Sequence, residues 1–84
     1  MPNRAGWVLF VREGCHLCED ARVLLDEMIG RDAYSALDIE ADDELLRRYA
    51  HRIPVLAVDG SDRLELVITR PDVVELLRDG QRPA

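Results

Sequence analysis

Two cysteines separated by two residues are the part of this sequence best suited to chemistry. Cys15 and Cys18 stand in the run Gly14-Cys15-His16-Leu17-Cys18, just before a segment with helical periodicity. Two thiols at this spacing in a small chain are typical of redox or metal chemistry, because a structural disulfide framework usually has four or more cysteines. Residues three apart on a helix lie on one face, so the two sulfur atoms can be bridged.

The start of a helix favours a thiolate. Its first turn presents unpaired N–H groups and the positive end of the helix dipole, which lower a thiol pKa from about 8.5 into the range of about 3.5–7.5. We therefore predict that Cys15, at the helix tip, is exposed and attacks a substrate disulfide as the thiolate. Cys18, one turn further on and shielded, would then resolve the mixed disulfide.

The neighbours of the pair have more than one interpretation. As an imidazolium, His16 would stabilise the Cys15 thiolate; otherwise it is a solvent-exposed turn residue. Leu17 either shapes the surface that meets the substrate or packs against the protein. A chance pairing of buried cysteines and a zinc site are the alternatives to a dithiol. Zinc normally takes four ligands, and the chain has no second Cys-X-X-Cys, so we predict no metal.

The hydrophobic pattern predicts the elements that must position this pair. The continuous apolar run 7–11 indicates a buried strand, and a helical stripe of five residues then ends near Gly30. The stripe consists of Leu17, Ala21, Leu24, Leu25 and Met28. Residues 34–39 are expected to form a second strand parallel to the first, which completes a right-handed crossover.

The second half of the chain predicts a short helix, a hairpin and a last helix. Asp42 or Asp43 can cap the short helix. The hairpin joins residues 55–58 to 64–68 through a turn at residues 59–62 with an Asp-Gly signal. Pro71 suits the first position of the last helix, and Gly80 is expected to end it. The expected order is strand–helix–strand–helix–strand–strand–helix.

Length and composition restrict the class of protein. A chain of 84 residues makes one domain over residues 1–84, with a core at about 7–78. The net charge of −6 argues against a nucleic-acid partner. No apolar run reaches the roughly 18–20 residues that cross a bilayer, and the first residues do not read as a signal peptide. We expect a cytoplasmic monomer that does not bind membranes.

Two blocks of sequence resemble the glutaredoxin-like branch of the thioredoxin superfamily. They are residues 9–21, which contain the cysteines, and His51-Arg52-Ile53-Pro54-Val55-Leu56. The resemblance is to short bacterial glutaredoxin-like proteins with a Gly-Cys-His-Leu-Cys site. It implies an α/β, thioredoxin-like fold of the glutaredoxin type, with three layers and a four-stranded mixed sheet. It also implies that Pro54 is cis and that the Ile53 backbone pairs with an extended substrate or glutathione near Cys15.

Other residues depart from the glutaredoxin pattern. His16 and Leu17 replace Pro-Tyr, Arg52 and Ile53 replace Thr-Val, and Thr69-Arg70-Pro71-Asp72 stands where the family has a Gly-Gly turn. By the resemblance, Arg52 or Arg48 would meet the glycine carboxylate of glutathione, and Arg70 and Asp72 its charged ends. The alternative for Arg47, Arg48 and Arg52 is a solvated face paired with Asp42 and Asp43.

These observations predict a thiol–disulfide oxidoreductase without a tightly bound cofactor. Its partners would be a disulfide-containing protein or a glutathione mixed disulfide, with glutathione or an unidentified reductase as electron donor. Two alternatives belong to other functional classes. One is a redox-inactive binding or adaptor module with this fold, and the other is glutathione-dependent binding of a [2Fe–2S] cluster.

Overall fold

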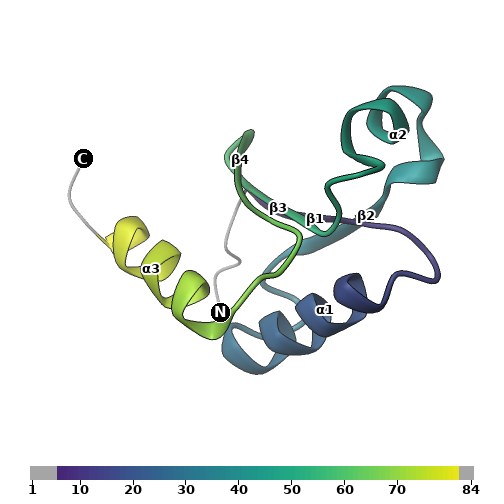
Figure 1. The fold of residues 1–84 in the computed structure, drawn as a ribbon. Helices are drawn as coiled ribbons and strands as arrows, with labels where there is room; N and C mark the ends of the chain where they lie inside the picture. The colour runs from purple at the N-terminus through teal and green to yellow at the C-terminus, as the bar shows by residue number, and fades with distance from the viewer. Residues whose placement is uncertain (1–5, 82–84) are drawn as a thin grey trace.

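The computed structural model describes residues 6–81, and its strands and helices follow the predicted order (Figure 1). A short 3-10 helix, which the sequence pattern did not predict, follows the second strand. The elements are β1 (Trp7–Val11), α1 (His16–Met28), β2 (Ser35–Asp38), η1 (Ile39–Ala41), α2 (Asp43–Tyr49), β3 (Val55–Val58), β4 (Ser61–Glu65) and α3 (Arg70–Gln81). Residues 1–5 and 82–84 of the predicted domain lie outside the described residues.

The four strands form one mixed sheet in the order β2-β1-β3-β4. β2 is parallel to β1, as expected for a strand–helix–strand crossover, and β3 and β4 are both antiparallel to their neighbours. Figure 1 shows α1 and α3 on one side of the sheet and α2 on the other. The predicted α/β architecture with a four-stranded mixed sheet is therefore confirmed.

Alternating side chains of β1 build a core on each face of the sheet. Trp7, Leu9 and Val11 pack with buried residues of α1 and α3, whereas Phe10 packs with Tyr49 of α2. The Phe10 and Tyr49 rings stack with centroids 4.4 Å apart. The apolar run that predicted a strand buried on both faces is explained by this three-layer arrangement.

Helix α1 uses a slightly different face from the predicted one. Cys18, Ala21 and Leu25 are its buried residues, and Leu17 is 41% exposed. Adjacent helical positions are about 100° apart, so a core face led by Cys18 turns Leu17 towards solvent. The end of the helix is as predicted, since Gly30 follows it with φ +95° and donates to the carbonyl groups of Leu25 and Asp26.

The prediction for the hairpin was wrong at its second strand, which begins at Ser61 and ends at Glu65. Asp59 and Gly60 both have positive φ, +52° and +85°, so they form the whole two-residue turn. The apolar residues expected in the strand, Leu66 and Val67, instead follow it and are 45% and 63% exposed. Leu66 has φ +67°, outside the extended range, and the strand stops before it.

The last helix begins at Arg70, which agrees with the expected start around Pro71. The prediction of its end was wrong, because the helix continues through Gly80 to Gln81. Glycine costs about 1 kcal/mol inside a helix but does not by itself end one. Within residues 6–81, no helix has both the length and the apolar character needed to cross a membrane.

Candidate functional site

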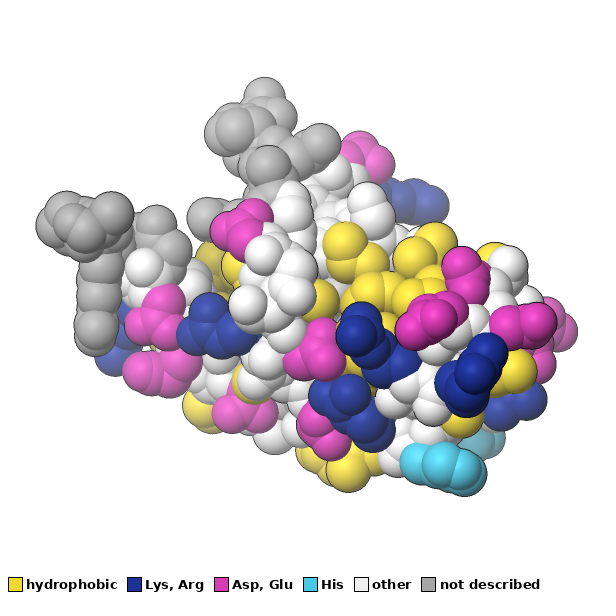
Figure 2. Space-filling model, turned by 90° about the horizontal axis from the view of Figure 1, so that it is seen from above, with side chains coloured by type: hydrophobic (Ala, Val, Ile, Leu, Met, Phe, Trp, Pro, Cys, Tyr) yellow, Lys and Arg dark blue, Asp and Glu magenta, His cyan; other side chains and the backbone are white. Residues whose placement is uncertain are grey.

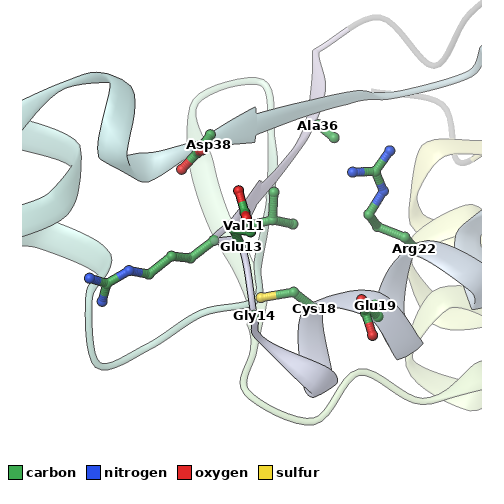
Figure 3. Close-up of a pocket in the computed structure, with 9 residues that line it drawn as sticks. Val11, Glu13, Gly14, Cys18, Glu19, Arg22, Ala36 and Asp38 are labelled. Carbon is green, nitrogen blue, oxygen red and sulfur yellow. The ribbon is translucent and has the colours of Figure 1, made fainter.

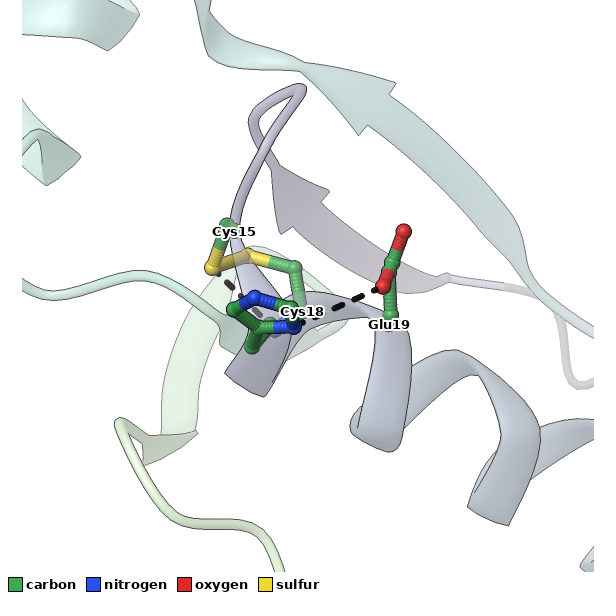
Figure 4. The surroundings of a disulfide bond; sticks show 4 residues. Cys15, Cys18 and Glu19 are labelled. Carbon is green, nitrogen blue, oxygen red and sulfur yellow. Dashed lines mark hydrogen bonds and ion pairs between the residues drawn. A yellow bond between two sulfur atoms is a disulfide. The ribbon is translucent and has the colours of Figure 1, made fainter.

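Cys15 and Cys18 are joined as a disulfide at the start of α1, with Cα atoms 5.2 Å apart (Figure 4). Cys15 is the N-cap of the helix, and the Cys18 backbone N–H donates to its Sγ atom at 3.1 Å. Cys18 is only 2% exposed, so its expected shielding is confirmed. Cys15 is half-buried rather than fully exposed, because it also packs against the core on the α1 side of the sheet.

The loop before the cysteines is fixed by contacts at both of its ends. Gly14 has φ +81°, and the Cys15 N–H donates to the Arg12 carbonyl at 3.3 Å. The Arg12 guanidinium pairs with Glu40 of η1 at 3.0 Å. The pair sits at a strand-to-helix junction, as the sequence predicted, and the loop that presents it is tied to a neighbouring element.

His16 and Leu17 lie on the outer side of the first turn of α1. The His16 side chain is 97% exposed, and its Nδ1 atom is 4.0 Å from the Glu19 carboxylate. Leu17 is 41% exposed. Both side chains are accessible to a molecule that approaches the disulfide, and neither is held by the core.

The Ile53–Pro54 bond is cis, as the resemblance implied. Pro54 is buried directly before β3, and its carbonyl accepts a hydrogen bond from the Leu66 N–H at 2.9 Å. Ile53 is half-buried and packs against both hydrophobic cores. Cys15 packs against the first of these cores, so Cys15 and Ile53 border the same group of buried side chains.

Arg52 has partners that the sequence did not indicate. Its guanidinium bonds to Glu65 at 2.9 Å and to Asp62 at 3.0 Å, both on β4. Both hydrogen bonds raise the pKa of Arg52 above its ordinary value, and the bond to Glu65 has the larger effect. The proposed pairing of the arginine cluster with Asp42 and Asp43 is wrong for Arg52. Asp42 instead caps α2 by accepting from the Glu44 N–H at 2.7 Å.

Asp72 belongs to a capping box at the start of α3. Its carboxylate accepts from the Thr69 N–H at 3.2 Å, and the Asp72 N–H donates to the Thr69 hydroxyl at 3.4 Å. Arg70 pairs with Glu27 of α1 at 3.1 Å. The residues in place of the family's Gly-Gly turn therefore make contacts within the chain. The Thr-X-X-Asp spacing before an apolar run is the sequence signal for such a box. The resemblance to glutaredoxins offered another interpretation of Asp72, as a contact for a charged end of glutathione.

We expect Asp72→Ala to lower the free energy of unfolding by about 1 kcal/mol. The substitution removes the acceptor of the Thr69 N–H, which the helix itself leaves without a partner. Urea unfolding followed by the fluorescence of the single tryptophan, Trp7, measures this change. Glu75→Ala, at an exposed position of the same helix, is the control. Equal stability of the two variants would show that the Asp72 carboxylate contributes nothing to the box.

A cavity of about 340 Å³ lies beside the disulfide, between the ends of β1 and β2 and the first turns of α1 (Figure 3). Cys18 lines it together with eight residues of mixed charge. These are Val11, Arg12, Glu13, Gly14, Glu19, Arg22, Ala36 and Asp38. Among residues 6–81, no three His, Cys, Asp or Glu side chains come together as a metal site would require.

Comparison with known proteins agrees with this geometry. Residues 7–79 match the family described as Glutaredoxin-like domain (DUF836). The chain belongs to this glutaredoxin-like family. The comparison with curated proteins finds no match.

Solved structures share the fold of this chain. Target protein XcR50 from X. campestris is 28% identical to this glutaredoxin-like chain, with a TM-score of 0.76 over 92% of this chain and 99% of that one. Protein Ne2328 from Nitrosomonas europaea is 31% identical, with a TM-score of 0.59, and the match covers 84% of this chain and 87% of that one. The holo form of glutaredoxin C1 from Populus tremula x tremuloides is 18% identical, with a TM-score of 0.54 over 92% and 78%, which concerns the fold alone. The predicted thioredoxin-like fold is confirmed.

Proposed function

We propose that this glutaredoxin-like protein is a thiol–disulfide oxidoreductase that works through Cys15 and Cys18. One observation carries the proposal: Cys15 caps a helix at the surface, and the shielded Cys18 bridges to it. A pair so placed is close enough to alternate between dithiol and disulfide. Membership of the family and the cis bond at Pro54 are consistent with this chemistry.

The reaction runs in two exchange steps. In the reduced protein, the Cys15 thiolate attacks one sulfur of the substrate disulfide, and the other sulfur leaves as a thiolate that takes up a proton. The Cys18 thiol then loses its proton and attacks Cys15, which releases the second substrate thiol. Two electrons pass from the dithiol to the substrate disulfide, and the Cys15–Cys18 disulfide remains.

The helix start provides the physical means to hold the thiolate. The Cys18 N–H points at Cys15 Sγ, and a hydrogen bond of this kind stabilises sulfur more strongly when it is charged. We expect the pKa of the Cys15 thiol in the reduced protein to lie below the ordinary value of about 8.5. The rate of alkylation by iodoacetamide as a function of pH, in Cys18→Ser, measures it, and a midpoint at or above about 8.5 would contradict the expectation.

The proposal extends to partners and location. The substrate is a protein disulfide or a glutathione mixed disulfide, which would meet Ile53, Leu17 and His16 beside Cys15. Glutathione or a reductase returns the dithiol to its reduced form. We propose the cytoplasm as the site of action, because a reducing compartment keeps such a pair ready to donate electrons. The working form is proposed to be a monomer.

Catalytic turnover tests the function. A small amount of the protein should accelerate the reduction of a disulfide-looped peptide by excess dithiothreitol, followed by chromatography after acid quenching. The matched control is the double variant Cys15→Ser/Cys18→Ser, checked for folding by circular dichroism. A rate no higher than that with the double variant would refute the proposed function.

A further inference from the structure

The residue before Ile53–Pro54 is bound by two carboxylates of β4. The Nε and Nη2 atoms of Arg52 donate to Glu65 Oε1 at 3.1 and 2.9 Å. Nη2 also donates to Asp62 Oδ2 at 3.0 Å. The side chains of all three residues are between 30% and 43% exposed, with Arg52 at 34%. The positive charge is therefore matched by two negative charges from its own chain.

This ion cluster is anchored in the core beneath α2. Tyr49 donates its hydroxyl hydrogen to Asp62 Oδ1 at 2.9 Å and is only 3% exposed. The Arg52 guanidinium carbon lies 5.2 Å from the centre of the Tyr49 ring, in range of a cation–π contact. Figure 2 views the molecule from above, from the side of the sheet that carries α2, and shows acidic and basic side chains side by side there. Asp62 thus joins the buried tyrosine to the arginine.

Backbone hydrogen bonds fix the same segment from two further directions. The Leu66 N–H, just after β4, lies 3.2 Å from the Arg52 carbonyl and 2.9 Å from the Pro54 carbonyl. At the other end, the N–H groups of Arg52 and Ile53 both donate to the Tyr49 carbonyl, at 2.8 and 3.2 Å. The Arg52 side chain adds a third attachment, which runs to Asp62 and Glu65 of β4.

Building on the proposed function, we propose that Arg52 is a positioning residue that holds the Ile53–Pro54 segment against β4, and that its counterions Asp62 and Glu65 leave the site indifferent to a carboxylate on the substrate. Among the described residues, the hydrogen bonds of Arg52 use Nε and Nη2 and leave Nη1 open. A substrate carboxylate that reached Nη1 would meet a guanidinium whose positive charge is already offset by Asp62 and Glu65. A disulfide within a polypeptide is joined to its neighbours through uncharged backbone. Its recognition therefore needs no cation that binds a carboxylate. The substrate class inferred is therefore a polypeptide disulfide recognised without a terminal carboxylate.

Two peptides test the inference. They share one sequence with a disulfide loop near the C-terminus and differ only in a free or an amidated terminal carboxyl group. The rate constant for reduction by the reduced protein is divided by that for dithiothreitol, which removes intrinsic differences in reactivity. For the wild type, we expect a ratio of the free to the amidated peptide within about 2-fold of one, since the guanidinium is neutralised.

Variants separate a positioning role from a ligand role. Arg52→Gln should slow both peptides by roughly 10-fold with the ratio still near one, because a loosened segment misplaces every substrate equally. Arg52→Lys should recover part of the rate. Asp62→Asn/Glu65→Gln keeps the hydrogen-bonding shapes but removes the counterions, and should favour the free carboxylate by about 5-fold at low salt. This double variant decides the question even if Arg52→Gln does not fold.

Asp79→Asn is the matched control. Asp79 pairs with Arg63 of β4 at 3.0 Å with similar exposure, so its removal frees a guanidinium on the same strand without touching Arg52. Its ratio should remain near one. The inference is overturned if the wild type favours the free carboxylate and Arg52→Gln abolishes that preference, or if the double variant shows none. If the wild type reduces neither peptide, the proposed function fails as well.

Discussion

Replacing Cys15 by serine should abolish disulfide reduction, with a loss of at least about 1,000-fold, because a serine hydroxyl is not ionised near neutral pH and is a weak nucleophile without an adjacent base. Replacing Cys18 by serine should have a different effect. The Cys15 thiolate still attacks, but the mixed disulfide with the substrate is no longer resolved. Stopped-flow measurement of the first exchange and mass spectrometry of the trapped adduct check both expectations.

The two serine variants also separate the oxidoreductase from a redox-inactive adaptor. Both should fold, since serine is nearly the size of cysteine and is itself a good N-cap at position 15. If the protein were an adaptor, the Cys15→Ser variant would still bind its partner. A Cys15→Ser protein that reduces disulfides as fast as the wild type, or adducts found on Cys18 instead of Cys15, would contradict the assigned roles.

Replacing Leu56 by alanine should remove between about a quarter and all of the stability of the domain. Leu56 is fully buried on the central strand β3, opposite the equally buried Leu9 of β1. A leucine-to-alanine change at such a site costs about 3–5 kcal/mol, and a domain of this size has a total of about 4–13 kcal/mol. Urea unfolding, followed by Trp7 fluorescence and by circular dichroism, measures the loss.

Val67→Ala is the control for this stability prediction. Val67 is 63% exposed in the segment between β4 and α3, so its truncation should change the free energy of unfolding by less than about 0.5 kcal/mol. If Leu56→Ala were no less stable than Val67→Ala, the assignment of Leu56 to the centre of the core would be wrong.

The sequence predicted those parts of the fold whose signals are local and strong. The apolar run 7–11 and the Gly30 stop bounded β1 and α1, and the spacing of Cys15 and Cys18 placed them at the helix start. The second strand of the hairpin was misplaced because residues 64–68 are apolar except for Glu65. The exposure of Leu66 and Val67 and the positive φ of Leu66 depend on the path that the chain takes towards α3.

The contacts of the site residues were harder to foresee than the residues themselves. Arg52 meets Asp62 and Glu65, which are 10 and 13 residues away across the hairpin. No periodic pattern specifies such a pairing, because it depends on the register of β4. The Thr69–Asp72 box is different, since its spacing was visible in the sequence. There the residue types allow both a helix cap and a ligand contact, and the hydrogen bonds of the structure show the cap.

A redox titration of the dithiol tests the central claim most directly. The protein is equilibrated in buffers of defined thiol–disulfide potential, free thiols are trapped by alkylation, and the fraction oxidised is measured by mass spectrometry. We predict one reversible two-electron transition between Cys15–Cys18 dithiol and disulfide, with a tenfold change in ratio for each 30 mV or so, at a potential within about −270 to −120 mV. Cysteines that never form the intramolecular bond, or that form it irreversibly, would contradict the account.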